Sequence, residues 1–131
     1  MSESFPDLPL LKTLRLAKPS DILRIGIVAT ASFRYSPVFR WERPYHEKFP
    51  QATLLAYRKE FTNALKNEQS VVLVVDDSFI PNESDFTEAI IPADNGWSAP
   101  ATGDKVVVGA MSFKFEPGSL RQGQFSFNDG M

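Results

Sequence analysis

The sequence predicts an α+β domain in which about three antiparallel strands pack against two helices. A first observation is an amphipathic pattern over residues 51–66, which has the 3.6-residue period of a helix. A second is a pair of β-branched runs, near residues 70–76 and 105–116, which are typical of strands. A chain of 131 residues, 43% of them hydrophobic, is long enough to bury one core without disulfide bonds. We therefore expect residues 1–131 to form a single domain.

The first strand and helix are expected within residues 13–33, after a flexible lead-in over residues 1–11. Residues 13–17 alternate apolar and polar side chains, which predicts a short strand that ends before Pro19. Proline suits the first position of a helix, because its missing N–H would have no partner there. The helix over 19–33 carries apolar residues on more than one side, so we expect it to be buried on two faces. Its main stripe is Ile22, Ile25, Ala29 and Phe33, with Leu23 and Ile27 outside it.

The second helix is expected to begin near Pro44 or after Pro50 and to run to about Asn67. The segment before it, residues 34–44, contains two prolines and several bulky aromatic side chains, which indicates irregular backbone. The expected core stripe of the helix is Leu54, Tyr57, Phe61, Ala64 and Leu65. The opposite, polar side carries Lys59, Glu60, Asn63 and Lys66. We expect the stripe to face the core.

Two strands are expected after this helix. Residues 70–76 form a continuous β-branched run that two acids close, which predicts a strand covered on both faces. Gly109 within the last strand, 105–116, indicates a bulge or a close backbone approach. One face of that strand is expected to carry Val107, Gly109, Met111, Phe113 and Phe115. Residues 117–131 are expected to form a polar tail, with a half-strand at Phe125 and Phe127.

The segment between the two strands is strongly acidic. Residues 76–104 contain seven acids and no Lys or Arg. A connection of nearly 30 residues in a compact domain is usually functional or disordered. One interpretation is a solvated surface insertion. The other is a lid or collar whose acids attract a cationic substrate, held to the body by Ile90, Ile91 and Trp97.

Composition excludes several functions. Fourteen Lys+Arg against sixteen Asp+Glu give a net charge of −2, which argues against nucleic acid as the main partner. No apolar run is long enough for a membrane span, and the acidic, proline-broken N-terminus is unlike a secretory signal, so we expect a cytoplasmic protein with no membrane partner. With no Cys and only His46, a Cys or multi-His metal site is excluded and we expect no metal.

A cluster of aromatic and Arg side chains is the most suggestive local feature. The cluster comprises Phe33, Arg34, Tyr35, Phe39, Arg40, Trp41 and Arg43. Arg stacked on an aromatic ring can present positive charge in a binding loop. The alternative is a hydrophobic plug between two helices, with the Arg head groups in water. We take Phe33, Phe39, Arg40 and Trp41 as the candidate substrate-binding residues.

Two other sites have ordinary alternatives. His46 beside Glu47 could pair as a base and its orienting acid, although a partly exposed His near a helix start is common. Asp76 and Asp77 could bind a hard cation, although acids also terminate strands without such a role. The sequence assigns no catalytic residue.

The order of elements and several short motifs resemble the N-terminal half of the GNAT superfamily of N-acetyltransferases, in particular its fungal branch. The matching residues are Leu14–Ile25, Ala31–Phe33, Ser36–Trp41, Val71–Asp76 and Val106–Phe113. The resemblance implies a GNAT-like fold with a long insertion between its second and third strands. It also implies an enzyme that moves an acetyl group from acetyl-CoA to a small amine, with residues 33–43 bordering the acceptor pocket.

The resemblance stops before the cofactor site. GNAT members bind the acetyl-CoA pyrophosphate with a loop like Gln/Arg-x-x-Gly-x-Gly/Ala, and no residues after Phe115 match it. We therefore expect no cofactor-binding residue here, no tight binding of acetyl-CoA and no activity from this chain alone. We also expect a homodimer through the Val106–Phe115 edge, which the missing half would otherwise pair.

Two alternatives to the enzyme remain open. One is a non-enzymatic, truncated or degenerate GNAT-like module that binds a partner or a small ligand. The other is an unrelated ligand-binding domain with a pocket between Trp41 and Trp97.

Overall fold

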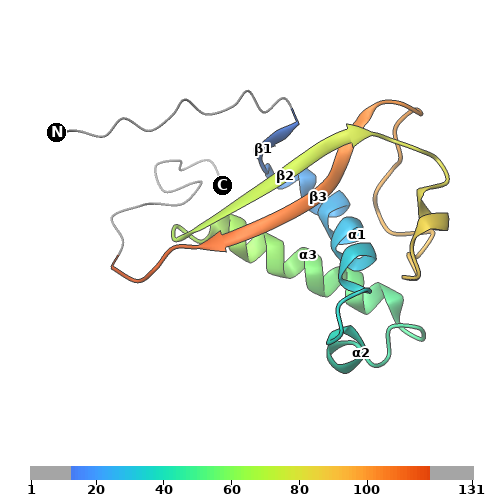
Figure 1. The fold of residues 1–131 in the computed structure, drawn as a ribbon, viewed down its shortest axis with the longest axis horizontal. Coiled ribbons are helices and arrows are strands. Elements are labelled where there is room, and N and C mark those ends of the chain that lie inside the picture. Colours follow the sequence, from blue (N-terminus) through green and yellow to red (C-terminus); the bar gives the residue numbers. More distant parts are fainter. Residues whose placement is uncertain (1–12, 119–131) are drawn as a thin grey trace.

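The computed structural model describes residues 13–118, which form an antiparallel three-stranded sheet with helices against one face (Figure 1). The elements in chain order are β1 (Leu14–Leu16), η1 (Pro19–Asp21), α1 (Ile22–Phe33), α2 (Phe39–Glu42), α3 (Pro50–Lys66), β2 (Ser70–Ser78), η2 (Glu83–Phe86) and β3 (Lys105–Lys114). The expected α+β class is therefore confirmed. The lead-in over 1–11 and the half-strand at Phe125 and Phe127 lie outside the described residues.

The sheet has the order β1-β2-β3, and the long β2 is its centre. On one side β1 pairs with β2 from Leu14↔Val75 to Leu16↔Leu73. On the other side β3 pairs along the whole of β2, with a shift in register between Val75 and Asp76. Val75 lies opposite Gly109 while Asp76 lies opposite Val107, so Val108 is an extra residue. The bulge expected at Gly109 is confirmed.

This bulge overturns the expected faces of β3. Cross-strand partners lie on the same face of a sheet, and Val74 and Asp76 share a face because they are two residues apart. Their partners Ala110 and Val107 therefore share that face, which is the one turned to the helices, and Val107 is only 3% exposed. The expectation that Val107 lies with Met111 and Phe113 was wrong, because the extra residue reverses the alternation.

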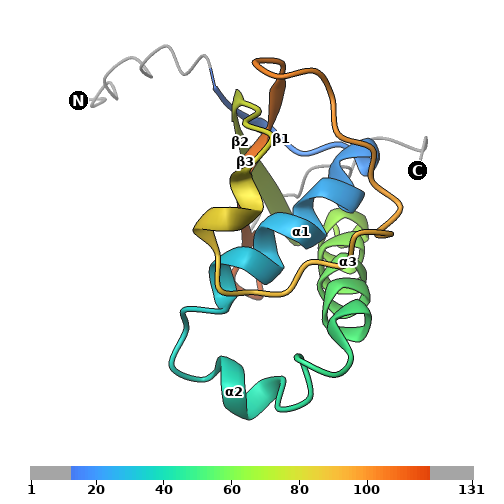
Figure 2. The same ribbon diagram turned by 90° about the vertical axis from the view of Figure 1, so that its right-hand side faces the viewer.

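The core lies between the sheet and the helices α1 and α3. Leu54, Tyr57, Phe61 and Leu65 of α3 are all buried, which confirms the expected stripe. Tyr57, Phe61 and Leu65 belong to one cluster with Val72 and Val74 of β2 and apolar residues of α1, and the partly buried Ala64 packs against this cluster. The polar side of α3 is exposed. Figure 2 shows α1 and α3 on the same side of the sheet.

Two burial expectations were partly wrong. On β2, Val72 and Val74 are fully buried, whereas Val71, Leu73 and Val75 are only half-buried, so the strand is covered on one face by the described helices. On α1, Ile27 is buried outside the main stripe as expected, but Leu23 is 43% exposed. Both results follow from placing all of the long helices against one face of the sheet.

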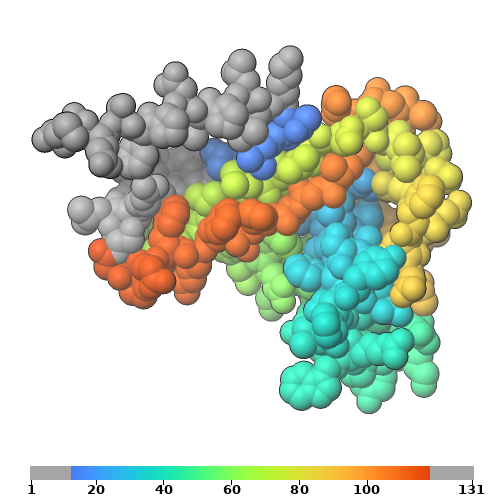
Figure 3. All heavy atoms as spheres, viewed as in Figure 1, coloured from blue at the N-terminus to red at the C-terminus, as the bar shows by residue number. Residues whose placement is uncertain are grey.

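The segment 34–44 is more regular than its composition indicates. It contains the short helix α2, which projects away from the sheet (Figure 3). Phe39 is 3% exposed and its ring lies edge-on to that of His46, with 5.2 Å between centroids. Phe39 also belongs to the core cluster, so its burial ties to the body a helix that is too short to be stable by itself.

The acidic connection between β2 and β3 wraps around α1. We call residues 79–104 the strap. Its first part, which contains η2, runs along one side of α1. Its second part crosses to α3 and returns to β3 (Figure 2). Backbone hydrogen bonds between Phe79 and Gly103 and between Phe79 and Asp104 close its two ends. No helix among the described residues is long and apolar enough to cross a bilayer.

The outer edge of β3 gives a first prediction. No described strand pairs with that edge, and Met111 and Phe113 on the face away from the helices are each about half exposed. We propose that a second copy pairs with this edge, so light scattering at ~100 µM, well above a micromolar dissociation constant, should give a dimer. We expect Met111→Lys to shift the mass toward the monomer. A monomer at this concentration for the unmodified chain would contradict the proposal.

Candidate functional site

A cavity lies between α1 and the first part of the strap. It has a volume of about 370 Å³. Its apolar lining is Ile27, Val28, Ala31, Phe86, Ile91 and Val108. Its polar lining is Arg24, Ser32, Tyr35, Glu83, Ser84 and Thr87. We call this cavity the strap pocket, and a mostly apolar pocket with a few polar groups is the usual form of a small-molecule site.

An ion pair between α1 and η2 forms one wall of the strap pocket. The Arg24 guanidinium donates from Nη1 and Nη2 to the two Glu83 carboxylate oxygens, the second at 2.7 Å, and from Nε to the Val107 carbonyl at 2.8 Å. The Arg24 side chain is 5% exposed while that of Glu83 is 30% exposed. The Glu83 side chain is therefore partly open to the pocket, while the guanidinium is enclosed.

Trp97 covers the other side of this guanidinium. The Arg24 Cζ atom lies 4.5 Å from the Trp97 ring centroid, and the same ring meets Phe79 edge-on at 5.9 Å. A cation over an aromatic face is attracted by the ring quadrupole. The expectation that Trp97 holds the strap to the body is thus confirmed by these contacts.

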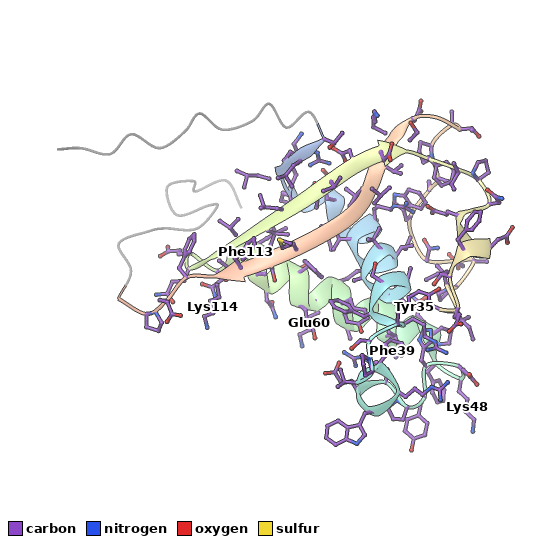
Figure 4. The ribbon with its side chains drawn as sticks, viewed as in Figure 1. Tyr35, Phe39, Lys48, Glu60, Phe113 and Lys114 are labelled. Atoms are coloured by element: carbon purple, nitrogen blue, oxygen red, sulfur yellow. The ribbon has the colours of Figure 1, made fainter. Side chains whose placement is uncertain are left out.

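Tyr35 and Thr87 close the end of the pocket next to α2. The Tyr35 hydroxyl donates to the Phe86 carbonyl at 3.4 Å and accepts from the Glu88 N–H at 3.2 Å. The Thr87 hydroxyl donates to the Ala31 carbonyl at 3.4 Å. Figure 4 shows Tyr35 beside the end of α1, on the side of the strap. These bonds are long, and they set the position of the strap over the pocket mouth.

A buried Arg holds the second part of the strap against both helices. Arg58 donates to the Leu23 carbonyl at 2.8 Å and to the Asn95 carbonyl at 2.7 Å. Burial lowers the pKa of Arg58, although the group remains charged at neutral pH. Its stem crosses Gly26, where an added Cβ would lie 2.5 Å from the Arg58 Cγ. Gly26 is thus required for this close approach of α1 to α3.

His46 also holds the strap, at Ile90. The Nε2 atom accepts the Ile90 N–H at 3.2 Å, and the Nδ1 atom lies 2.9 Å from the Thr53 hydroxyl. Since Nε2 is the acceptor, the neutral ring carries its proton on Nδ1. Burial, aided by the charge of Arg34, lowers the pKa of His46 below its usual 6.5. His46 is therefore a structural acceptor in its neutral form.

This geometry predicts a pH dependence of stability. Because the folded protein lowers the pKa of His46, the unfolded chain binds the proton more readily, and stability is lost as pH falls below about 6.5. We expect the melting temperature to fall between about pH 7.5 and pH 5.5. The variant His46→Gln keeps a hydrogen-bond acceptor but does not titrate, so its melting temperature should fall less over the same pH range. An equal fall in the two proteins would contradict this role of His46.

The structure divides the four candidate substrate-binding residues. Phe39 and Arg40 border a second hollow of about 260 Å³, described below. Phe33 stacks on Tyr57 with 5.2 Å between ring centroids, and Trp41 is 87% exposed. None of the four lines the strap pocket, so a role for them in binding its ligand stays a prediction. A side chain as exposed as Trp41 does not enclose a pocket with Trp97.

Asp76 takes part in an ion-pair cluster. Arg15 donates to Asp76 at 2.6 Å and to Asp21 at 2.8 Å. Burial raises the pKa of Asp21, but the hydrogen bonds from Arg15 and from the Lys18 N–H together outweigh burial. The pKa of Asp21 is therefore lower than its usual value. The pairing with Arg15 explains why an acid, Asp76, stands near the end of β2, and it requires no bound metal cation. Within residues 13–118, no three acidic or His side chains gather in an arrangement that could hold a metal ion.

Sequence reasoning missed most of the strap pocket. Arg24 is the only charged residue of α1, and an isolated charge in a mainly apolar helix indicates a buried partner. Its partner Glu83 is 59 residues away, among several equivalent acids of the strap. The choice among those acids depends on tertiary structure alone.

Comparison with known proteins gives one distant relative. The chain is 28% identical over 109 residues to a protein named acetyltransferase from Stachybotrys chartarum (strain CBS 109288 / IBT 7711), a match that covers 80% of this chain and 45% of the relative. The chain thus spans about half the length of the curated relative that it matches. No family model matches the chain. No solved structure matches it.

Proposed function

We propose that this chain is the amine-binding part of an acetyl-CoA-dependent N-acetyltransferase of the GNAT type. Two findings support the proposal: the distant relation to a protein named acetyltransferase, and an α+β fold whose elements follow the order that the GNAT resemblance implies. The observation that carries it is the strap pocket, a cavity with apolar walls and the partly exposed Glu83 side chain among its polar lining.

The charges around the strap pocket favour a cationic ligand. Every charged residue of the strap is an acid. Glu83 and Glu88 are paired with Arg24 and Arg34, while Asp85, between the lining residues Ser84 and Phe86 in η2, makes no ion pair with a described residue. A concentration of one sign of charge beside a low-dielectric pocket raises the local concentration of the opposite ion. A small primary amine with an apolar body fits this combination of lining and charge.

The described residues do not fit the acetyl-CoA pyrophosphate. A pyrophosphate needs converging backbone donors, normally from a Gly-rich turn that leads into a helix. The only strand here that leads directly into helical turns is β1, and the Asp21 carboxylate already accepts the Lys18 N–H at that turn. No acetyl-transfer step is assigned to these residues. We propose that the acetyl-CoA pyrophosphate is held by parts of the enzyme outside residues 13–118.

A titration with an amine and its neutral analogue tests the proposal. We expect 2-phenylethylamine to bind the full chain saturably, with a dissociation constant of about 1 mM or tighter, and 2-phenylethanol to bind at least about fivefold more weakly. Ala31→Phe fills the pocket wall and should abolish amine binding. Ala52→Phe adds the same ring at an exposed position of α3 and should not.

The outcomes separate the proposal from its alternative. Equal binding of the amine and the alcohol would indicate a non-enzymatic module that takes an apolar ligand. No saturable binding of either probe, or binding that Ala31→Phe leaves unchanged, would contradict the assignment of the strap pocket.

A further inference from the structure

A second concavity lies between α2, the segment that follows it and the end of α1. It has a volume of about 260 Å³. Its functional lining is Arg34, Phe39, Arg40, Arg43, His46 and Glu47, and we call it the arginine hollow. Its lining residues are different from those of the strap pocket. Figure 4 shows Phe39 at this end of the molecule, far from Lys114 at the other end of the sheet.

The three guanidinium groups of the hollow are weakly neutralised. Arg34 faces the Glu88 carboxylate at 3.4 Å, and Arg43 faces the Glu60 carboxylate at 3.9 Å. Both carboxylates are more than 60% exposed, so water screens these pairs. Arg40 makes no ion pair with any described residue. Glu47 is the only acid in the lining itself, which leaves an excess of positive charge.

Arg43 adds an independent observation. Its Nε atom is buried and has no hydrogen-bond acceptor among the described residues. A buried donor without a partner is uncommon in folded proteins and calls for an explanation. The Arg43 guanidinium lies over the Tyr57 ring, with its Cζ atom 5.5 Å from the centroid, so its orientation is fixed by packing. Arg43 lines the hollow, so its guanidinium brings donor capacity to this wall that no described residue fully uses.

We propose that the arginine hollow binds the anionic group, phosphate or carboxylate, of a small ligand. Guanidinium groups present planar forks of donors that match both oxyanions, and such charge-assisted bonds are the strong ones. Arg34 and Arg43 frame the hollow and Arg40 contributes a cation that the fold leaves unpaired. This site is separate from the strap pocket and does not depend on the amine proposal.

His46 provides a direct reporter for this site. It is the only His in the chain, so its ring signals in an NMR spectrum need no further assignment. It lines the hollow, and the charges that act on it come from Arg34, which lowers its pKa, and Glu47, which raises it; Arg40 and Arg43 share the same hollow. A bound anion offsets these cations, so binding should shift the His46 signals and raise the pKa of the ring.

The experiment titrates the full chain with inorganic phosphate, pyrophosphate and succinate at 150 mM NaCl while the His46 ring signals are followed. We expect a saturable shift with at least one probe. Saturation with the phosphates alone identifies a phosphoryl ligand, and saturation with succinate alone identifies a carboxylate. No saturable shift below about 20 mM with any of the three would overturn the proposal.

Two matched variants localise the binding. Arg40 is exposed, so the Arg40→Gln variant should fold normally. It should bind the tightest-binding anion at least about tenfold more weakly, as expected for one lost charge-assisted hydrogen bond. Lys114→Gln removes the same charge at the far end of the sheet and should change the affinity less than about twofold. Equal weakening by the two variants would mean attraction to overall charge rather than a site, and would overturn the proposal.

Discussion

Phe61→Ala should lower the free energy of unfolding by about 3–5 kcal/mol, the range for removing a buried Phe. Phe61 is 8% exposed at the centre of the α3 stripe and belongs to the cluster that joins α3 to β2 and α1. The truncation removes the transfer free energy of the ring and leaves a cavity that the rigid sheet cannot fill. Urea denaturation followed by circular dichroism measures the change.

Lys59→Ala on the opposite side of α3 is the matched control. Its side chain is exposed, so the free energy of unfolding should change by less than about 0.5 kcal/mol. Equal losses for the two variants would contradict the orientation of α3.

Glu83→Ala should destabilise the protein by about 2–4 kcal/mol, because it leaves the enclosed Arg24 charge without its partner. The Arg24 side chain is 5% exposed and keeps only the Val107 carbonyl and the Trp97 ring after this change. We place the loss toward the lower part of the range for buried pairs, since the Glu83 side chain is 30% exposed. Urea denaturation followed by Trp fluorescence measures the loss.

Glu88→Ala in the same strap provides the control. Its carboxylate is 64% exposed and lies 3.4 Å from Arg34, so its loss should cost less than about 0.5 kcal/mol. If Glu83→Ala were as mild as Glu88→Ala, the strap would not be held by the Arg24 pair.

The elements with a regular period could be predicted from the sequence. The α3 stripe follows the helical repeat over about three turns, so Leu54, Tyr57 and Phe61 could be placed in the core from the sequence. The β-branched runs likewise placed β2 and β3. The bulge at Gly109 could be inferred, but its effect on the face of Val107 depends on the register with β2.

The short helix α2 and the strap pocket could not be predicted. Four residues are too few for a helical period, and α2 is held by the burial of Phe39 in the core and against His46. The strap pocket depends on Arg24 meeting Glu83 across 59 residues, which no local pattern encodes. Of the candidate residues, Phe39 and Arg40 do border a concavity, but it is the arginine hollow rather than the larger pocket.

Calorimetric titration of the full chain with acetyl-CoA tests most directly the proposal that this chain supplies the amine side of an acetyltransferase and not the cofactor side. We expect no complex tighter than about 10 µM, near −7 kcal/mol. A weaker, salt-sensitive binding signal that the Arg40→Gln variant loses would come from the acetyl-CoA phosphates binding in the arginine hollow. A dissociation constant below about 10 µM would contradict the proposal, because it would mean that a cofactor cleft is assembled from residues 33–43 and the end of this chain.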